Sequence, residues 1–366
     1  MRAPAQLSRA VALRLVAWGA LLFGMLGCVD AAPLNALAPV VQKPAPAGDV
    51  ERAHAALLPT TEAAVVVVLD GARWQDVLVG VDATLAAAAH LPPSDIVAAD
   101  AIMPNLHAMI ARGALVGGPH GGQPMIASGP NYVSLPGYNE IFSGRFPVRC
   151  QDNDCPQTRE ATLADLVGDA AVFSSWAPIA RAASATPASG VAGLFVSTGQ
   201  PTTGEFREDN ETAKVALDHL VESRPRFLFL GLGEPDEYAH RGDYPGYLAS
   251  LRRDDAILGD LAARLEAMGE RGRRTSVLVT CDHGRGSNFR DHGAAWAESS
   301  RVWLVASGGG IPVRGPVESP VPHRLADIAP TIYALMGLPG DRSPRAGTAI
   351  AELLPEDALD RREARR

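Results

Sequence analysis

The sequence predicts an α/β fold, a three-layer α/β/α sandwich with a mostly parallel central sheet. Two observations carry this prediction. Short continuous apolar runs rich in β-branched residues, such as residues 65–69, are typical of strands buried on both faces. These runs alternate along the chain with amphipathic stretches of helical period, and such alternation favours parallel strands joined by helices.

The predicted elements follow one another from residue 63 onward, and no internal repeat interrupts them. Strand-like or helix-like runs appear, in chain order, as AAVVVVLD, IMPNLHAMIARG, ATLADLVGD, AAVFSSW, RFLFLGLGEPD, YLASLRRDDAILGDLAARLEAMG, SVLVTCDHG, RVWLVASGG and HRLADIAPTIYALMG. The YLASLRRDDAILGDLAARLEAMG run is helix-like. A chain of 366 residues is long enough to bury a sizeable core, and one large domain is the simpler expectation.

The charge of the chain bears on its partners. The net charge is -8 and the isoelectric point is near 5.6, and the basic residues are scattered apart from a short Arg-rich tail at residues 361–366. Proteins that bind a nucleic-acid backbone usually cluster Lys and Arg on one surface. The sequence therefore predicts no nucleic-acid-binding surface.

The N-terminus has the features of an export signal. Arg2, Arg9 and Arg14 precede the apolar run LVAWGALLFGMLG, which is short for a membrane-spanning helix and fits a secretory signal. The run ends at Cys28, and MLGC resembles the lipobox of bacterial lipoproteins, which implies acylation of Cys28. Cleavage near VDAA by an ordinary signal peptidase is the alternative. Either way we expect a protein that works outside the cytoplasm, in the periplasm or anchored to a membrane.

The chain divides into four predicted parts. Residues 1–28 are the signal segment, and residues 29–60 form an Ala/Pro-rich tether without a sustained period. Residues 61–356 form the predicted catalytic domain, and residues 357–366 form a charged tail. Beyond the signal, no hydrophobic segment reaches spanning length, so we expect membrane contact only through the lipid anchor.

The remaining cysteines fit an oxidising compartment. Cys150 and Cys155 flank the polar loop CQDNDC and are predicted to close a small disulfide. Their spacing is loose for a zinc knuckle, and no second pair exists to complete one. Cys281 follows the apolar run SVLVT and is expected to be a buried, free thiol.

Acidic side chains follow three of the predicted strands. Asp70, Asp236 and Asp282 each come at or shortly after the end of an apolar run. Taken singly, each is typical of a helix N-cap or a turn. Because the carboxyl ends of parallel strands line one crevice, the three together favour a shared site.

Histidines accompany these acids. His283 directly follows Asp282, His292 stands nine residues later, and His240 lies four residues after Asp236. On a helix, positions four apart share a face, so Asp236 and His240 are predicted to grip one ion. Mixed Asp and His ligands suit zinc or manganese better than calcium. Six such residues exceed the needs of one tetrahedral ion, so the sequence predicts two metal ions, zinc with manganese as the alternative.

The segment NYVSLPGYNEIFSG holds the candidate nucleophile. Ser134 precedes a Pro-Gly pair, and a serine in that position is usually a turn residue. Ser134 can be both a turn residue and a nucleophile, because Pro136 and Gly137 are predicted to form a tight strand-to-helix turn that presents Ser134 beside the acids.

In order and approximate spacing, six segments resemble the alkaline phosphatase superfamily. They span residues 65–339 and read VVVVLDGARWQDVL, SLPGYNEIFSG, EPDEYAH, VTCDHG, DHGAAW and LADIAPTIYALMGLP. The resemblance implies an alkaline-phosphatase-like fold and a metal-dependent hydrolase of phosphate esters, and EPDEYAH is closest to the nucleotide pyrophosphatase/phosphodiesterase branch.

The resemblance also implies a role for each matching position. Ser134 takes the place of the nucleophile. The metal beside it would be held by Asp70, Asp282 and His283, and the second metal by Asp236, His240 and His292.

Departures from the family pattern limit the prediction of substrate. Formylglycine sulfatases carry Arg four residues after the modified position, where this chain has Tyr138, so that route is not expected. No clear counterpart exists for the Asn with which many phosphodiesterases bind a non-bridging oxygen. The candidates for substrate contact are Asn139, Asn153, Arg145 and Arg285, since an Arg fork suits a phosphoryl group.

The expected reaction is hydrolysis of a small phosphate monoester or diester through a phosphoseryl intermediate on Ser134. One alternative is a phosphotransferase or mutase of the same superfamily, against which the export signal counts. Another is a lipoprotein that binds metal or a phosphorylated glycan without catalysis.

Overall fold

The computed structural model describes residues 61–119, 121–186, 193–199 and 206–356. The predictions for the signal segment, Cys28, the tether at residues 29–60 and the charged tail at residues 357–366 fall outside these described residues. Among the described residues, no helix is both long and apolar enough to cross a bilayer.

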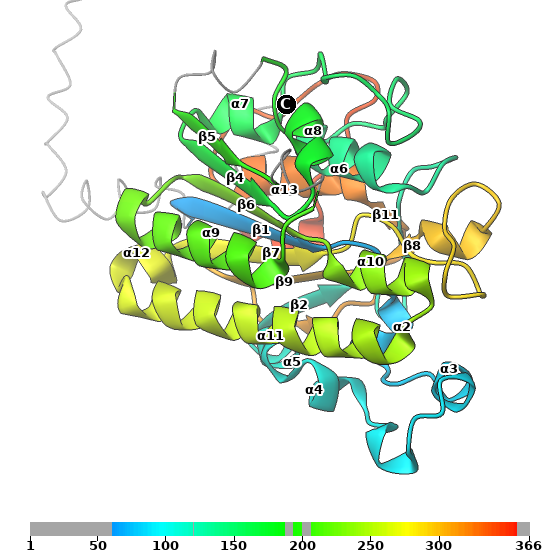
Figure 1. The fold of residues 1–366 in the computed structure, drawn as a ribbon. Coiled ribbons are helices and arrows are strands. Elements are labelled where there is room, and N and C mark those ends of the chain that lie inside the picture. The colour runs from blue at the N-terminus through cyan, green and yellow to red at the C-terminus, as the bar shows by residue number, and fades with distance from the viewer. Residues whose placement is uncertain (1–60, 120, 187–192, 200–205, 357–366) are drawn as a thin grey trace, which may run out of the picture. The chain divides into compact units, whose positions relative to one another are not determined.

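An eight-stranded sheet forms the centre of the fold, with strand order β10-β2-β9-β7-β1-β6-β4-β5 (Figure 1). Its strands are β1 (Ala63–Leu69), β2 (Gly113–Val116), β4 (Ala170–Ser174), β5 (Leu194–Ser197), β6 (Phe227–Leu232), β7 (Thr275–Thr280), β9 (Leu304–Gly308) and β10 (Gly315–Pro316). All neighbouring pairs are parallel except those that β9 makes with β2 and β7. The predicted mostly parallel sheet is therefore confirmed.

Strand β1 occupies the middle of the sheet because it is apolar on both faces. All seven of its residues are buried, and the sequence AAVVVVL offers no polar side chain to turn toward water. It pairs in parallel with β6 on one side and with β7 on the other. Buried β-branched runs of this kind are what a sheet covered by helices on both faces requires.

Helices cover both faces of this sheet, as the three-layer prediction expects. On one face lie α9 (Asp209–Ser223), which contacts β4 and β6, and α5 (Pro104–Ala111), which contacts β2 and β9. The long helix α11 (Tyr244–Ala267) packs across both of them. On the opposite face lie α6 (Ser134–Ser143) and α13 (Ile328–Leu335), visible behind the sheet in Figure 1.

Shorter elements complete the fold. The strand-like run at residues 301–308 divides between two sheets, since β8 belongs to a small three-stranded sheet of order β11-β3-β8 while β9 joins the large one. The remaining strands and helices are β3 (Met125–Ile126), β8 (Arg301–Val302), β11 (His323–Arg324), α2 (Trp74–Leu78), α3 (Ala83–Ala88), α4 (Ala99–Ile102), α7 (Leu163–Val167), α8 (Ala180–Ala183), α10 (Glu234–Arg241) and α12 (Glu270–Arg273).

Helix α6 is buried along its whole length. All ten of its residues are buried, and the Phe142 ring packs against Phe229 of β6 with 4.4 Å between ring centroids. Pro136 and Gly137 lie within the first turn of α6, so the predicted separate strand-to-helix turn is replaced by the helix itself. Pro is tolerated there because the first N–H groups of a helix have no intrahelical acceptor.

The carboxylate of Glu140 holds α6 to two distant segments. Its Oε2 accepts a hydrogen bond from the backbone N–H of Ser128 at 2.9 Å, and its Oε1 accepts one from the N–H of Ala326 at 3.0 Å. Burial raises the pKa of Glu140 to about 7, although the hydrogen bonds from Ser128 and Ala326 oppose the rise. Glu140 is thus a structural acid inside the helix that begins at Ser134.

Cys150 and Cys155 form a disulfide, and Cys281 is a buried free thiol just beyond β7. The loop closed by the disulfide is tied to α8, because the Arg181 guanidinium donates to the carbonyls of Asn153 and Cys155, each at 3.1 Å.

Replacement of Asp255 by Ala should destabilise the fold. Asp255, buried in α11, accepts hydrogen bonds from the N–H groups of Asn105 at 3.0 Å and Leu106 at 2.9 Å, and so caps the first turn of α5 from another helix. Without it these donors stay buried without a partner, which should lower the free energy of unfolding by roughly 3 kcal/mol. Chemical denaturation measures the loss. Asp260→Ala, on an exposed position of the same helix, should change it by no more than about 0.5 kcal/mol.

Replacement of Glu140 by Gln should flatten the pH dependence of stability. The folded-state pKa of about 7 exceeds the ordinary 4.5, so the contribution of Glu140 is complete below pH 4.5 and is lost as the pH rises to 7. That loss amounts to about 3 kcal/mol in the wild type. Denaturant unfolding across this pH window should show a smaller decrease in the variant, and equal decreases in both proteins would contradict the assignment.

Candidate active site and metal centre

Three neighbouring parallel strands end at one edge of the sheet, and an acidic side chain follows each of them. Asp70 comes directly after β1, and Asp282 with His283 lies just beyond β7. Asp236 lies in α10, which begins two residues after β6 ends. Since β1 pairs with both β6 and β7, the three strand ends are adjacent and the predicted convergence of these acids occurs.

The first group of side chains surrounds the hydroxyl of Ser134. Its Oγ lies 3.2 Å from Nε2 of His283 and 3.4 Å from Oδ1 of Asp70. The same Nε2 lies 3.5 Å from Asp70 Oδ1 and 3.5 Å from Asp282 Oδ2. Ligand atoms of the two acids and His283 all lie within 4.8 Å of one another, close enough to share one cation.

The second group lies next to the first. Asp236 Oδ2 is 3.0 Å from Nε2 of His240, which is 3.0 Å from Nε2 of His292. As predicted, Asp236 and His240 share one face of a helix. The rings of His283 and His292 stack with centroids 3.9 Å apart, so the two groups touch. His240 is exposed at the rim, whereas His283 is fully buried.

Backbone carbonyls orient two of the imidazoles. Nδ1 of His283 lies 2.9 Å from the carbonyl of Gly284, and Nδ1 of His292 lies 2.9 Å from that of Tyr132. A neutral ring that donates from Nδ1 presents the lone pair of Nε2 to the site. Burial lowers the pKa of both histidines, well below the ordinary value for His283, which keeps the rings in this neutral form.

Among the described residues, neither Asp70 nor Asp282 has an arginine or lysine as a direct partner. Burial raises the pKa of Asp70 well above its ordinary value, and the charges of Asp282 and Asp236 add to the rise. Burial and the charge of Asp236 likewise raise the pKa of Asp282 to about 8. The Oδ2 atom of Asp282 is buried and has no hydrogen-bond partner in the described part of the chain. Two carboxyls that are costly to ionise in this state indicate a place built for an added cation.

Arg285 supplies the fixed positive charge within the site. Its Nη1 donates to Asp236 Oδ1, while Nε and Nη2 donate to the carbonyls of Phe289 and Arg290. Burial raises the pKa of Asp236, but Arg285 and the hydrogen bond from His240 outweigh burial and hold that pKa well below the usual range. The Arg285 guanidinium, which the sequence suggested as a phosphoryl clamp, is therefore bound by the protein itself, and the residue is only 3% exposed.

The other predicted substrate contacts fall in three different places. Arg145 pairs with Asp341 at 2.5 Å and with Glu160 at 3.6 Å. Asn139 faces a separate cavity on the far side of α6. Asn153 lies at the site, because its Oδ1 accepts the N–H of Leu135 at 2.9 Å, immediately after Ser134. The disulfide loop carries Asn153 there, which no local sequence signal shows.

Tyr138 also belongs to the site, although in the sequence it is notable only as the position at which a formylglycine sulfatase carries arginine. Its hydroxyl donates to Asp70 Oδ2 at 2.9 Å, and its side chain is fully buried. The available signal was its spacing, because Tyr138 stands four residues after Ser134 and so shares its helix face.

Two glycines allow the backbone to approach the site closely. A Cβ on Gly137 would lie 2.4 Å from the carbonyl oxygen of Asp282, so only glycine lets α6 reach the end of β7. Gly71 has a φ of +60°, and a Cβ there would lie 2.5 Å from Asp236 Oδ1. These contacts fix the distance between the helix and the strand ends.

Comparisons of the sequence with known proteins point to one family. A family model described as the metalloenzyme superfamily matches residues 197–340. A 2,3-bisphosphoglycerate-independent phosphoglycerate mutase of Dinoroseobacter shibae is 30% identical over 170 residues, covering 40% of this chain and 31% of the mutase. The corresponding enzyme of Thermomicrobium roseum is 29% identical over 138 residues, covering 35% and 24%. The chain thus spans less than a third of the length of these relatives.

Comparisons of the structure give the same fold. A putative sulfatase from Bacteroides thetaiotaomicron superposes with a TM-score of 0.58 at 14% identity, covering 80% of this chain and 74% of the sulfatase. The phosphonate monoester hydrolase of Agrobacterium radiobacter gives a TM-score of 0.54 at 16% identity, covering 81% and 78%. Metalloenzymes of this superfamily imply a divalent metal, which the acids and imidazoles described above fit. The resemblance read from the six motifs is confirmed, because residues 197–340 match the metalloenzyme superfamily and the chain has an alkaline-phosphatase-like fold.

Proposed function

We propose that the protein hydrolyses phosphate esters, with Ser134 as the nucleophile. The observation that carries the proposal is the position of the Ser134 hydroxyl. It begins a wholly buried helix and lies 3.2 Å from His283 Nε2 and 3.4 Å from Asp70 Oδ1, beside carboxylates that lack a counter-charge. A serine that only formed a turn would not need to lie beside buried acids and an imidazole.

The proposed cofactors are two divalent cations, zinc with manganese as the alternative. One would be held by Asp70, Asp282 and His283, the other by Asp236, His240 and His292. Bound there, they would lower the pKa of the serine hydroxyl and neutralise charge on the phosphoryl oxygens. The unpartnered Oδ2 of Asp282 and the mixed oxygen and nitrogen donors of Asp70, Asp282 and His283 support the first set. For the second ion, the ligand atoms that lie within 4.8 Å of one another belong to Asp236, His292 and His283, and His240 adds its Nε2 at 3.0 Å from both Asp236 and His292.

The residues of the chain then have distinct tasks. Ser134 Oγ gives up its proton to solvent and forms a bond to phosphorus, the ester P–O bond breaks, and the leaving oxygen takes up a proton from solvent and departs as the alcohol. Water next cleaves the phosphoserine, which releases phosphate and restores the hydroxyl. Helix α6 begins at Ser134, so the positive end of its dipole lies beside the anionic group, while the N–H of Leu135 is already bound to Asn153 Oδ1. Asn153 lies beside Leu135 N–H and offers its NH₂ group to a non-bridging oxygen.

A small phosphate monoester or diester is the proposed substrate. Tyr138 donates to Asp70 from the position where a formylglycine sulfatase carries Arg, which supports unmodified Ser134 chemistry. We place this activity outside the cytoplasm, in line with the export signal, and the Cys150–Cys155 disulfide supports that proposal.

A second candidate is transfer of the phosphoryl group to an acceptor alcohol. The curated relatives that match this chain are phosphoglycerate mutases, which favours keeping this alternative. Product analysis with an added acceptor alcohol separates the two, since a hydrolase releases inorganic phosphate and a transferase yields a new ester.

Replacement of Ser134 by Ala, and removal of metal, should each abolish hydrolysis. The test compares turnover of a phosphate monoester, a phosphate diester and a sulfate monoester by the purified protein, with and without chelator. We expect loss of at least about a thousandfold in kcat for Ser134→Ala, since the covalent route disappears. Turnover that persists in the variant or survives the chelator would refute the proposal, and preference for the sulfate ester would redirect it.

Replacement of Asn153 by Ala should weaken transition-state stabilisation without unfolding the protein. Loss of one donor to a developing charge should reduce kcat/KM by about tenfold to a hundredfold. The neighbouring exposed Asp154, mutated to Ala, serves as the matched control and should retain full activity. Equal kinetics for Asn153→Ala and wild type would remove Asn153 from the site.

A further inference from the structure

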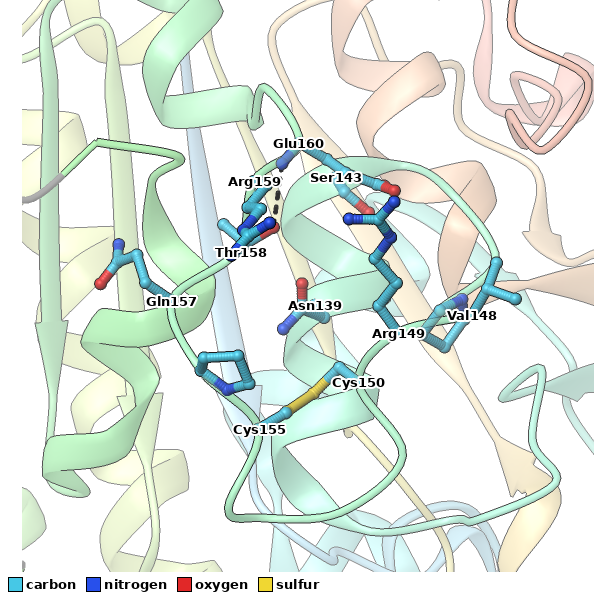
Figure 2. A pocket seen from close by; sticks show the side chains of 12 residues that line it. Asn139, Ser143, Val148, Arg149, Cys150, Cys155, Gln157, Thr158, Arg159 and Glu160 are labelled. Atoms are coloured by element: carbon cyan, nitrogen blue, oxygen red, sulfur yellow. Dashed lines mark hydrogen bonds between the residues drawn. A yellow bond between two sulfur atoms is a disulfide. The ribbon is translucent and has the colours of Figure 1, made fainter.

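A second cavity lies between α6 and the segment of residues 147–160 (Figure 2). Its volume is about 220 Å³, whereas a site for a single water needs roughly 10–15 Å³. Neither Ser134 nor any of the six candidate metal ligands lines it. The cavity is therefore separate from the site described above.

Asn139 supplies a buried donor to this cavity. The residue is 8% exposed, and its Nδ2 has no hydrogen-bond partner among the described residues. It lies five residues after Ser134, a rotation of about 140° around the helix, so it faces away from the nucleophile. Figure 2 shows its amide between the disulfide and Thr158. A buried N–H without an acceptor is costly, which makes this atom a ready partner for a ligand oxygen.

Further donors line the same space. The Thr158 hydroxyl accepts the N–H of Glu160 at 3.3 Å, and the Ser143 hydroxyl accepts that of Arg145 at 3.2 Å, which leaves both hydroxyl hydrogens available.

Two arginines add positive charge to the wall. Arg149 and Arg159 are exposed, and neither forms an ion pair with any residue in the described part of the chain. The carboxylate on the wall, Glu160, is already bound by Arg345 and lies 3.6 Å from Arg145. A water molecule would also satisfy the Asn139 amide, but an anion bound there would in addition be attracted by the two guanidinium groups. The polar lining thus favours an anion.

The rest of the lining is apolar. Pro147, Val148, Pro156 and the Cys150–Cys155 disulfide form the remaining surface next to these donors. We propose that the cavity is a second ligand site for a small organic oxyanion, a sulfate, phosphate or carboxylate group on an apolar body. Its oxygen accepts from Asn139 Nδ2, and its charge lies near Arg149 and Arg159. This site does not depend on the reaction proposed for Ser134.

Calorimetric titration of the purified protein tests this site, with benzenesulfonate as the organic oxyanion and inorganic sulfate as the oxyanion without an apolar body. Ionic strength is held constant. We expect benzenesulfonate to bind more tightly than sulfate. Binding should be about tenfold weaker in Asn139→Leu and at least that much weaker in the double variant Arg149→Gln/Arg159→Gln.

The control variant is Arg252→Gln, which removes an exposed arginine without a described partner from α11 and should bind as the wild type does. Asn139→Leu should also keep or raise the melting temperature, because its amide has no internal partner to lose. A purely structural Asn139 would instead destabilise the fold when replaced.

Three results would overturn the inference. One is the absence of benzenesulfonate binding to the wild type. Another is unchanged binding in both Asn139→Leu and the double arginine variant, which would assign the ligand to a different place. The last is equal weakening in Arg252→Gln, which would show general attraction to a basic surface rather than a built site.

Discussion

The candidate site depends on three carboxylates held at the ends of three adjacent strands, with Asp70 and Asp282 buried and Asp236 partly exposed. Asp70 and Asp282 follow β1 and β7 directly, while Asp236 follows β6 by way of α10. Parallel pairing of β1 with both neighbours leaves these acids no freedom to separate. Burial and neighbouring like charges raise the pKa of Asp70 and Asp282, whereas Arg285 holds the pKa of Asp236 low, so Asp70 and Asp282 need cations to be fully ionised.

Arg285 supplies a positive charge to Asp236, whereas Asp70 and Asp282 have no arginine or lysine as a direct partner among the described residues. Its guanidinium is bound to Asp236 and to two backbone carbonyls, so its position is fixed before any substrate arrives. Asp70 has a hydrogen bond from Tyr138, and Asp282 one from the N–H of Gly71, but neither has a full positive charge as a direct partner among the described residues. The negative charge of Asp236 is therefore neutralised by Arg285, whereas that of Asp70 and Asp282 is not. A divalent metal thus suits the side of the site next to Ser134, where Asp70 and Asp282 lie.

Opposite faces of helix α6 border the candidate active site and the separate cavity beside the disulfide. One face carries Ser134 and Tyr138 to the strand ends, and Gly137 permits the close approach to Asp282. The other face carries Asn139 into the cavity closed by the disulfide loop. The same loop carries Asn153 to Leu135. The ring closed by the Cys150–Cys155 disulfide therefore borders both the candidate active site and the separate cavity.

The sequence by itself determined the sheet, the helices and the set of acids and imidazoles. Uninterrupted β-branched runs specify buried parallel strands, and polar residues just beyond them mark the crevice, so local pattern was enough for Asp70, Asp282 and His283. Only the tertiary structure decided which hydrogen-bond or ion-pair partner each long side chain has. Arg285 binds Asp236, Tyr138 binds Asp70, and Asn139 and Asn153 lie at different sites. These contacts depend on distances between elements that are far apart in the chain, and no local sequence pattern encodes such distances.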